Sequence, residues 1–119
     1  MTALTNFVKS FGYALHGIKQ SFHNQRNIKI QSCIGILVLL LSVYYQITRT
    51  EFYLVLILTF LVLILEMVNT ALEKTIDYIS LERNKKLGEI KDIMAGAVLM
   101  AAFLSAVVGL IIFFPYVFG

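Results

Sequence analysis

The chain has 119 residues, of which 59% are hydrophobic and 14% charged, and its formal net charge is +3. Its mean hydropathy of +0.82 excludes a water-soluble domain of this length, because a small globule needs polar surface to cover itself. The composition therefore predicts a single membrane-embedded domain. The positive charge does not indicate a nucleic-acid partner, since the basic residues stand beside apolar segments.

The first predicted element is an amphipathic helix over about residues 4–24. Its apolar residues recur at intervals of three and four and so share one stripe: Leu4, Phe7, Phe11, Leu15, Ile18 and Phe22. A helix with this pattern lies in the headgroup plane of a membrane and does not cross it. We therefore expect a surface helix ahead of the membrane spans.

Three longer apolar segments follow, over about residues 28–48, 51–79 and 89–117. The first is uncharged from 30 to 48, which is close to the ~20 residues that a spanning helix needs. The second contains neither proline nor glycine, so one long helix is predicted there. The sequence thus predicts an all-α membrane protein with three transmembrane helices and one surface helix.

Turn signals and charges predict how these spans are connected and oriented. Arg49, Thr50 and Glu51 are expected to form the turn between the first two spans, and Gly88 to mark a break before the third. Lysine and arginine are concentrated in the N-terminal segment and in residues 74–92. Because basic residues stay on the cytoplasmic side, we expect a multi-pass protein of the cytoplasmic (inner) membrane with its N-terminus in the cytoplasm.

Four polar residues stand at the end of the second span, where carboxylates are costly to place and usually functional. They are Glu66, Asn69, Glu73 and Asp77, which we call the polar ladder. At 100° and ~1.5 Å per residue they share an arc of about 80° and extend about 16 Å along the helix. The ladder is therefore expected to rise from the membrane interior into the cytoplasmic layer.

Lys91 and Asp92, at the start of the third span, are expected to face this ladder. One interpretation is a salt-bridge network that stabilises an oligomer. The other is a metal and nucleotide site, in which carboxylates hold Mg²⁺ and a lysine offsets phosphate charge. Phosphoryl transfer requires mainly positioning and charge neutralisation, and this cluster supplies both.

Small residues share roughly one face of the third span: Ala95, Ala102, Ser105, Ala106 and Gly109. Small side chains let helices approach closely in lipid, so this face is predicted to pack against a neighbour, within the chain or in another copy. Because three short spans make a thin bundle, a cavity is easier to build between copies. A homo-oligomer is therefore expected.

Three stretches of the sequence together resemble the bacterial diacylglycerol kinase and undecaprenol kinase family of small membrane kinases. They are "SFGYALHGIKQSF" near the N-terminus, "EMVNTALEKTID" from Glu66 to Asp77, and "KDIMAGAVLMAA" from Lys91 to Ala102. The resemblance implies a homotrimer whose active sites lie at the cytoplasmic interface between subunits. It also implies transfer of the γ-phosphate of ATP, with Mg²⁺, to the hydroxyl of a membrane lipid alcohol, either undecaprenol or diacylglycerol.

The resemblance assigns roles by position. Glu66 would be the general base near the lipid hydroxyl, Asn69 would position the reacting groups, and Glu73 would hold the metal. The residues implied at the ATP site are Tyr13, Gln25, Glu73, Asp77, Glu82, Lys91 and Asp92. Gln25 stands where the family usually has a glutamate that shares the metal, so weaker Mg²⁺ binding is implied.

Two other functions remain open at this stage. A small channel or transporter would use the acidic ladder as an ion path, but only Thr59 is polar between Phe52 and Leu65, so the ladder stops halfway. A non-catalytic membrane assembly is favoured by Gln25 alone. The absence of a P-loop and of a kinase glycine-rich motif excludes the soluble ATP-binding folds.

Overall fold

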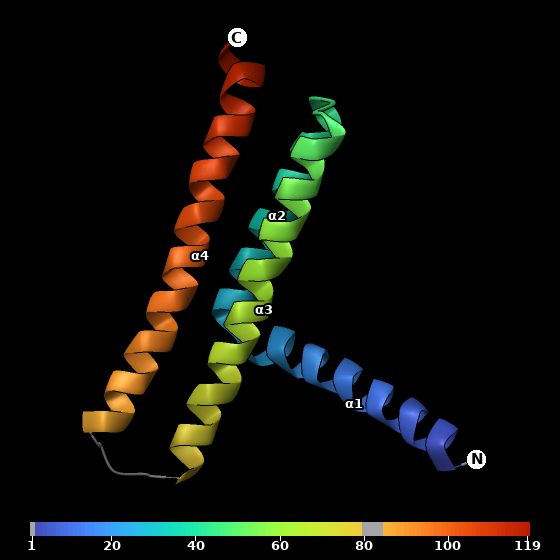
Figure 1. Ribbon diagram of the computed structural model, residues 1–119, viewed down its shortest axis with the longest axis vertical. Helices are drawn as coiled ribbons and strands as arrows, with labels where there is room; N and C mark the ends of the chain where they lie inside the picture. The colour runs from blue at the N-terminus through green and yellow to red at the C-terminus, as the bar shows by residue number, and fades with distance from the viewer. Residues whose placement is uncertain (1, 80–84) are drawn as a thin grey trace.

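The structure is a computed structural model that describes residues 2–79 and 85–119. These residues form four α-helices: α1 (Thr2–Asn24), α2 (Arg26–Tyr44), α3 (Arg49–Ile79) and α4 (Lys85–Phe118). Figure 1 shows α2, α3 and α4 running side by side, while α1 leaves this bundle at a steep angle. The last three helices are long and apolar enough to cross a membrane, which confirms the all-α prediction with three candidate spans.

The central helix of the bundle is α3. It packs against both α2 and α4, whereas α2 and α4 make no backbone contact with each other. Val55, Val62 and Ile76 of α3 are buried in these contacts. The arrangement leaves a gap between the two outer helices, with α3 at its base.

Most large apolar side chains point away from the bundle. Leu37 of α2, Ile57 of α3 and Phe103 of α4 are each more than half exposed. In lipid such exposure costs nothing, because the surroundings are as apolar as the side chains. Cohesion between the helices therefore depends on close packing and not on hiding hydrophobic surface from water.

The helices α2 and α3 pack closely at Gly35. This glycine is buried, and a Cβ atom added to it would lie 2.6 Å from Cγ2 of Thr59. No side chain fits at that distance without displacing its neighbour. Gly35 thus sets the separation of α2 and α3.

The helix α2 ends at Tyr44, although the predicted span continued to residue 48. The N–H of Gln46 donates to the carbonyl of Val43, and the N–H of Ile47 donates to that of Ser42. Gln46 has a φ of 50°, which is in the left-handed region. Together with the two hydrogen bonds, this residue completes a Schellman motif at the end of α2. The sequence does not signal this end, because glycine usually occupies the left-handed position.

The next helix begins earlier than the predicted turn allowed. The backbone N–H of Thr48 donates to Oε1 of Glu51 at 3.0 Å, and the N–H of Glu51 donates to Oγ1 of Thr48 at 3.2 Å. This reciprocal pair is a capping box. Arg49, Thr50 and Glu51 therefore form the first turn of α3 and not the connecting turn.

Three further predictions concern α4 and α1. Gly88 lies inside α4, which begins at Lys85, so it does not break the helix. The small-residue face of α4 turns partly toward the gap between α2 and α4. The buried residues of α4 are instead Val98, Ala101 and Ile112. In α1 the apolar stripe is exposed, and its placement on a membrane surface stays a prediction.

Candidate active site

Burial decreases steadily along the polar ladder of α3. Glu66 is buried, with 7% of its surface exposed, Asn69 and Glu73 are half-buried, and Asp77 is exposed. All four belong to one uninterrupted helix, so their order in depth follows directly from their order in the sequence. The helix presents its polar groups in a graded series from the bundle interior to the surface.

Asn69 is hydrogen-bonded to the next carboxylate of the ladder. Its Nδ2 donates to Oε1 of Glu73 at 3.4 Å, while its Oδ1 is buried and accepts no hydrogen bond from the residues that the structure describes. A buried amide oxygen without a partner is costly. Asn69 therefore offers an acceptor, beside Glu66 and Glu73, for a hydroxyl or a cation.

Thr70 is a site residue that the sequence analysis missed. It is 5% exposed, and its Oγ1 donates to the backbone carbonyl of Glu66 at 2.9 Å. Its position four residues after Glu66, on the same helix face, was the available signal. The bond supports the turn of helix from which the Glu66 side chain projects.

An ion pair joins the outer end of the ladder to α4. Nζ of Lys91 lies 2.6 Å from Oδ1 of Asp77, and the two side chains are 36% and 66% exposed, respectively. Asp92 is also exposed, one residue along α4. An exposed pair of this kind contributes at most about 1 kcal/mol to stability. Its charged groups remain accessible to a soluble ligand.

The other predicted site residues lie on α1, between α1 and α2, or outside the described segments. Tyr13 is on α1, is 73% exposed, and belongs to a helix that makes no backbone contact with α4. Gln25 lies between α1 and α2, where its extended backbone caps α2 without a side-chain bond. Glu82 lies outside the residues that the structure describes.

The described residues include no group of three histidine, cysteine or acidic side chains that could hold a metal ion. Mg²⁺ does not require such a cage, because proteins commonly bind it through one or two carboxylates together with substrate phosphates. Glu73 and the free Oδ1 of Asn69 are oxygen donors of the kind that Mg²⁺ prefers. The donor set therefore fits a metal that arrives with a nucleotide.

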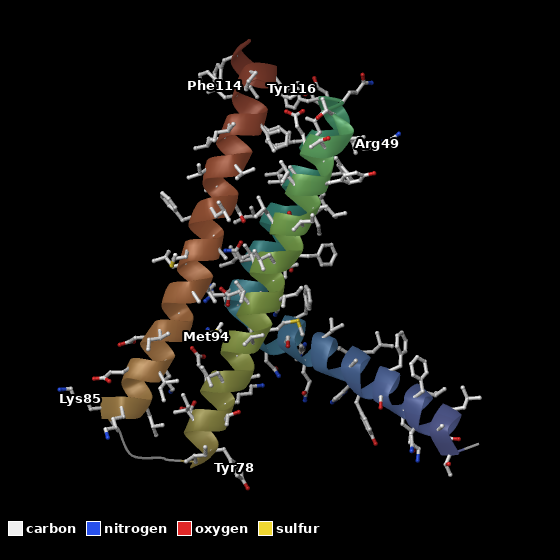
Figure 2. The ribbon with its side chains drawn as sticks, viewed as in Figure 1. Arg49, Tyr78, Lys85, Met94, Phe114 and Tyr116 are labelled. Carbon is white, nitrogen blue, oxygen red and sulfur yellow. The ribbon has the colours of Figure 1, made fainter. Side chains whose placement is uncertain are left out.

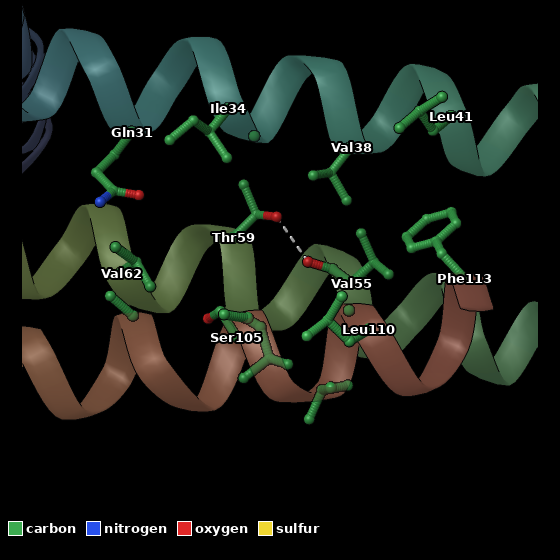
Figure 3. Close-up of a pocket in the computed structure, with 16 residues that line it drawn as sticks. Gln31, Ile34, Val38, Leu41, Val55, Thr59, Val62, Ser105, Leu110 and Phe113 are labelled. Carbon is green, nitrogen blue, oxygen red and sulfur yellow. Dashed lines mark hydrogen bonds between the residues drawn. The ribbon is translucent and has the colours of Figure 1, made fainter. Parts of the chain in front are cut away.

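A groove of about 540 Å³ runs along the bundle between α2 and α4, with α3 at its base. Its lining includes Gln31 and Val38 of α2, Val62 of α3, and Ser105 and Phe113 of α4. Figure 3 shows Gln31 at one end and Phe113 at the other. We call it the three-helix groove, and the sequence analysis did not anticipate it.

The groove is apolar and ends one helical turn from the inner end of the polar ladder. Val62, at its near end, is one helical turn from Glu66 on the same buried face of α3. The hydroxyls of Thr59 and Ser105 donate to carbonyls four residues earlier in their own helices, as Figure 3 shows for Thr59. Both hydroxyls thus already donate hydrogen bonds within their own helices. The groove therefore suits a hydrocarbon chain better than an ion.

The model of the family described as prokaryotic diacylglycerol kinase matches residues 12–113 of this sequence. The chain belongs to this family. The undecaprenol kinase of Bacillus subtilis is 32% identical over 94% of this chain and 91% of its own length. A diacylglycerol kinase of Synechocystis is 35% identical over 87% of this chain and 60% of its own length, and one of Haemophilus influenzae is 31% identical over 95% and 97%.

Membership in the diacylglycerol kinase family confirms the resemblance stated from the sequence, and with it the prediction of a membrane lipid kinase. It disfavours the channel and the non-catalytic assembly. The relatives carry two different substrate names at nearly equal identity, so identity alone does not select the acceptor lipid.

Proposed function

We propose that this chain transfers the γ-phosphate of ATP to the hydroxyl of a membrane lipid alcohol at the cytoplasmic face of the membrane. The observation that carries the proposal is the graded burial of the polar ladder. Its buried end lies one helical turn from Val62 in the lining of an apolar groove, and its exposed end carries the Asp77–Lys91 pair. A hydrophobic alcohol and a charged nucleotide can therefore approach the polar ladder from its two ends.

The proposed reaction assigns one role to each ladder residue. The carboxylate of Glu66 accepts the proton of the lipid hydroxyl as the hydroxyl oxygen forms a bond to the γ-phosphorus. The bond between that phosphorus and the bridging oxygen breaks, and ADP leaves. Asn69 helps to position the reacting groups, with its free Oδ1 available as an oxygen ligand beside Glu73, and Lys91 offsets negative charge on the phosphates.

Mg²⁺ would be held by Glu73, with Gln25 as the neutral oxygen ligand that the family resemblance implies. When bound, it would neutralise phosphate charge and orient the terminal phosphates. Tyr13, Asp77, Glu82 and Asp92 would complete the nucleotide site. Because Tyr13 lies on a helix remote from α4 within one chain, a site between subunits of a homotrimer would bring these groups together.

The acceptor is undecaprenol or diacylglycerol, and the three-helix groove is the proposed place for its hydrocarbon chain. Val62 at the near end of the groove is one helical turn from Glu66, so a chain that enters from this end would place its hydroxyl near the proposed base. Both alcohols combine one reactive hydroxyl with long apolar chains. Diacylglycerol carries two ester-linked acyl chains and undecaprenol one long branched chain, so the shape of the groove would distinguish them.

The deciding experiment measures transfer of labelled phosphate from ATP into lipid by the purified full-length protein with Mg²⁺. Undecaprenol and diacylglycerol are assayed side by side in the same detergent micelles. We expect labelled lipid with at least one alcohol and a ratio of kcat/KM that identifies the substrate. An absence of labelled lipid with every alcohol tested would overturn the proposal.

A further inference from the structure

The two ends of the three-helix groove differ in chemistry. The near end lies at Gln31 and Val62, one helical turn of α3 from Glu66, whereas the far end lies at the ring of Phe113. From Ala102 to Phe113 the lining of α4 extends about 16 Å, as the rise of an α-helix requires. This length is about half of the ~30 Å hydrocarbon core of a membrane. Half of the core corresponds to one leaflet.

Aromatic rings close the far end of the groove. The ring of Tyr45, just after α2, lies 6.4 Å from that of Phe113 and 6.2 Å from that of Tyr116, between ring centroids. Because α2 and α4 make no backbone contact along their length, these rings bridge the two helices at this end. Edge-to-face and tilted contacts of this kind fix the orientation of each ring.

A hydrogen bond holds the aromatic rings in place. The hydroxyl of Tyr116 donates to Oε1 of Glu51 at 2.5 Å, and Glu51 is itself fixed by its capping box with Thr48. Figure 2 shows Tyr116 beside the start of α3 at Arg49. Phe113 is therefore a supported wall and not a freely rotating side chain at the groove's end.

We propose that Phe113 is the end wall of the site for the acceptor's hydrocarbon chain and that it determines which chain lengths are used. The inference rests on the proposed function, which places the chain in the groove with its hydroxyl at Glu66. Moving a chain from lipid into the groove gains no hydrophobic free energy, because both surroundings are apolar. Steric fit therefore determines which chains are accepted. A chain longer than the groove must bend out through the open side of the groove.

The test uses the full-length protein in mixed micelles with Mg-ATP and two acceptor series. One series is diacylglycerols that lengthen by two carbons, and the other is prenols that lengthen by one isoprene unit. For the natural chain we expect kcat/KM to rise with chain length to a maximum and then fall. For Phe113→Ala the maximum should move to longer chains by at least one step of each series.

A matched control is available one residue further along α4. Phe114 is 61% exposed, and its ring contacts Phe118 and not the groove, so Phe114→Ala should leave the length profile unchanged. Phe113→Leu, which keeps more of the side-chain volume, should shift the maximum less than Phe113→Ala. It serves as the test if the alanine variant does not fold, as judged by thermal unfolding.

Two results would overturn the inference while leaving the proposed function intact. One is an active Phe113→Ala protein with the length profile of the natural chain. The other is a change in oligomeric mass without a change in profile, which would mean that a second copy of the chain occupies the groove. A protein without activity toward any alcohol would instead overturn the proposed function itself.

Discussion

Glu66 is the only buried acidic residue among those that the structure describes. Its neighbours on the same helix face are Val62, which lines the groove, and Thr70, which donates to its backbone carbonyl. A buried carboxylate in such surroundings costs free energy of folding. Ionisable residues placed within a membrane segment usually have a function. At the scale of single residues, this is the strongest indication of a catalytic base.

Replacing Glu66 with glutamine tests that role. The amide keeps the size and hydrogen-bonding shape of the side chain but does not accept a proton, so we expect turnover to fall roughly 100-fold or more. Nucleotide binding and thermal stability should change little. Lipid phosphorylation is the readout, and Glu89→Gln, at an exposed position of α4, is the control. Normal turnover in Glu66→Gln would mean that another group accepts the proton.

A variant at Gln25 tests the proposed metal site by adding a charge, whereas Glu66→Gln removes one. A carboxylate at this position adds one negative charge to the ligand set, so Gln25→Glu should lower the Mg²⁺ concentration for half-maximal activity by roughly tenfold. Asn27→Asp adds the same charge at an exposed position nearby and should have a much smaller effect. Equal effects of the two variants would indicate general attraction of cations and not a ligand at Gln25.

At the scale of helices, the contact between α2 and α3 determines the width of the three-helix groove. Gly35 permits this contact because a Cβ atom there would collide with Cγ2 of Thr59. Both residues also line the groove. A change in this contact should therefore affect stability and the shape of the proposed substrate site together.

Gly35→Ala is expected to lower the free energy of unfolding by about 1–3 kcal/mol, since overpacking forces the helices apart. Thr59→Ser removes the methyl group that would collide, so the double variant should recover most of the loss. Gly96→Ala is the control, because a Cβ atom at Gly96 meets nothing within 4 Å. Thermal unfolding in detergent measures all three, and a double variant no more stable than Gly35→Ala would contradict the explanation.

Two helix ends show how much local sequence signals reveal. Thr48 and Glu51 have the spacing of a capping box, so the start of α3 was predictable from the sequence. The end of α2 was not, because Gln46 takes a left-handed conformation that usually falls to glycine. Only the hydrogen bonds of the Schellman motif identify it.

At the scale of the whole molecule, one chain leaves proposed site residues far apart. Tyr13 lies on α1, which makes no backbone contact with α4, while Lys91 and Asp92 lie on α4. A homotrimer with sites between subunits remains a prediction that resolves this separation. Ala95 is part of the small-residue face and is exposed in the single chain, so a neighbouring copy is its available packing partner.

We expect the detergent-solubilised protein to have the mass of three chains by native mass spectrometry. Ala95→Leu should shift the population toward smaller species, because a large side chain prevents close approach of helices in lipid or detergent. Ala3→Leu makes the same change at an exposed position of α1 and should leave the mass unchanged. A fully active monomer would exclude a site built between subunits.

The sequence by itself determined the features that depend on neighbouring residues along one helix. Apolar length identified three candidate spans, and the 3.6-residue period placed Glu66, Asn69, Glu73 and Asp77 on one face of α3. Both depend on composition and spacing within one continuous segment. The family motifs, which are also local, carried the prediction of a lipid kinase.

The tertiary structure alone decided the features that join distant segments. Lys91 pairs with Asp77, Tyr116 donates to Glu51, and α2 and α4 flank α3 to form the groove that ends at Phe113. In an apolar sequence many helix faces look alike, because lipid and protein interior select the same side chains. Which faces meet is fixed by packing at positions such as Gly35, and that choice created the groove.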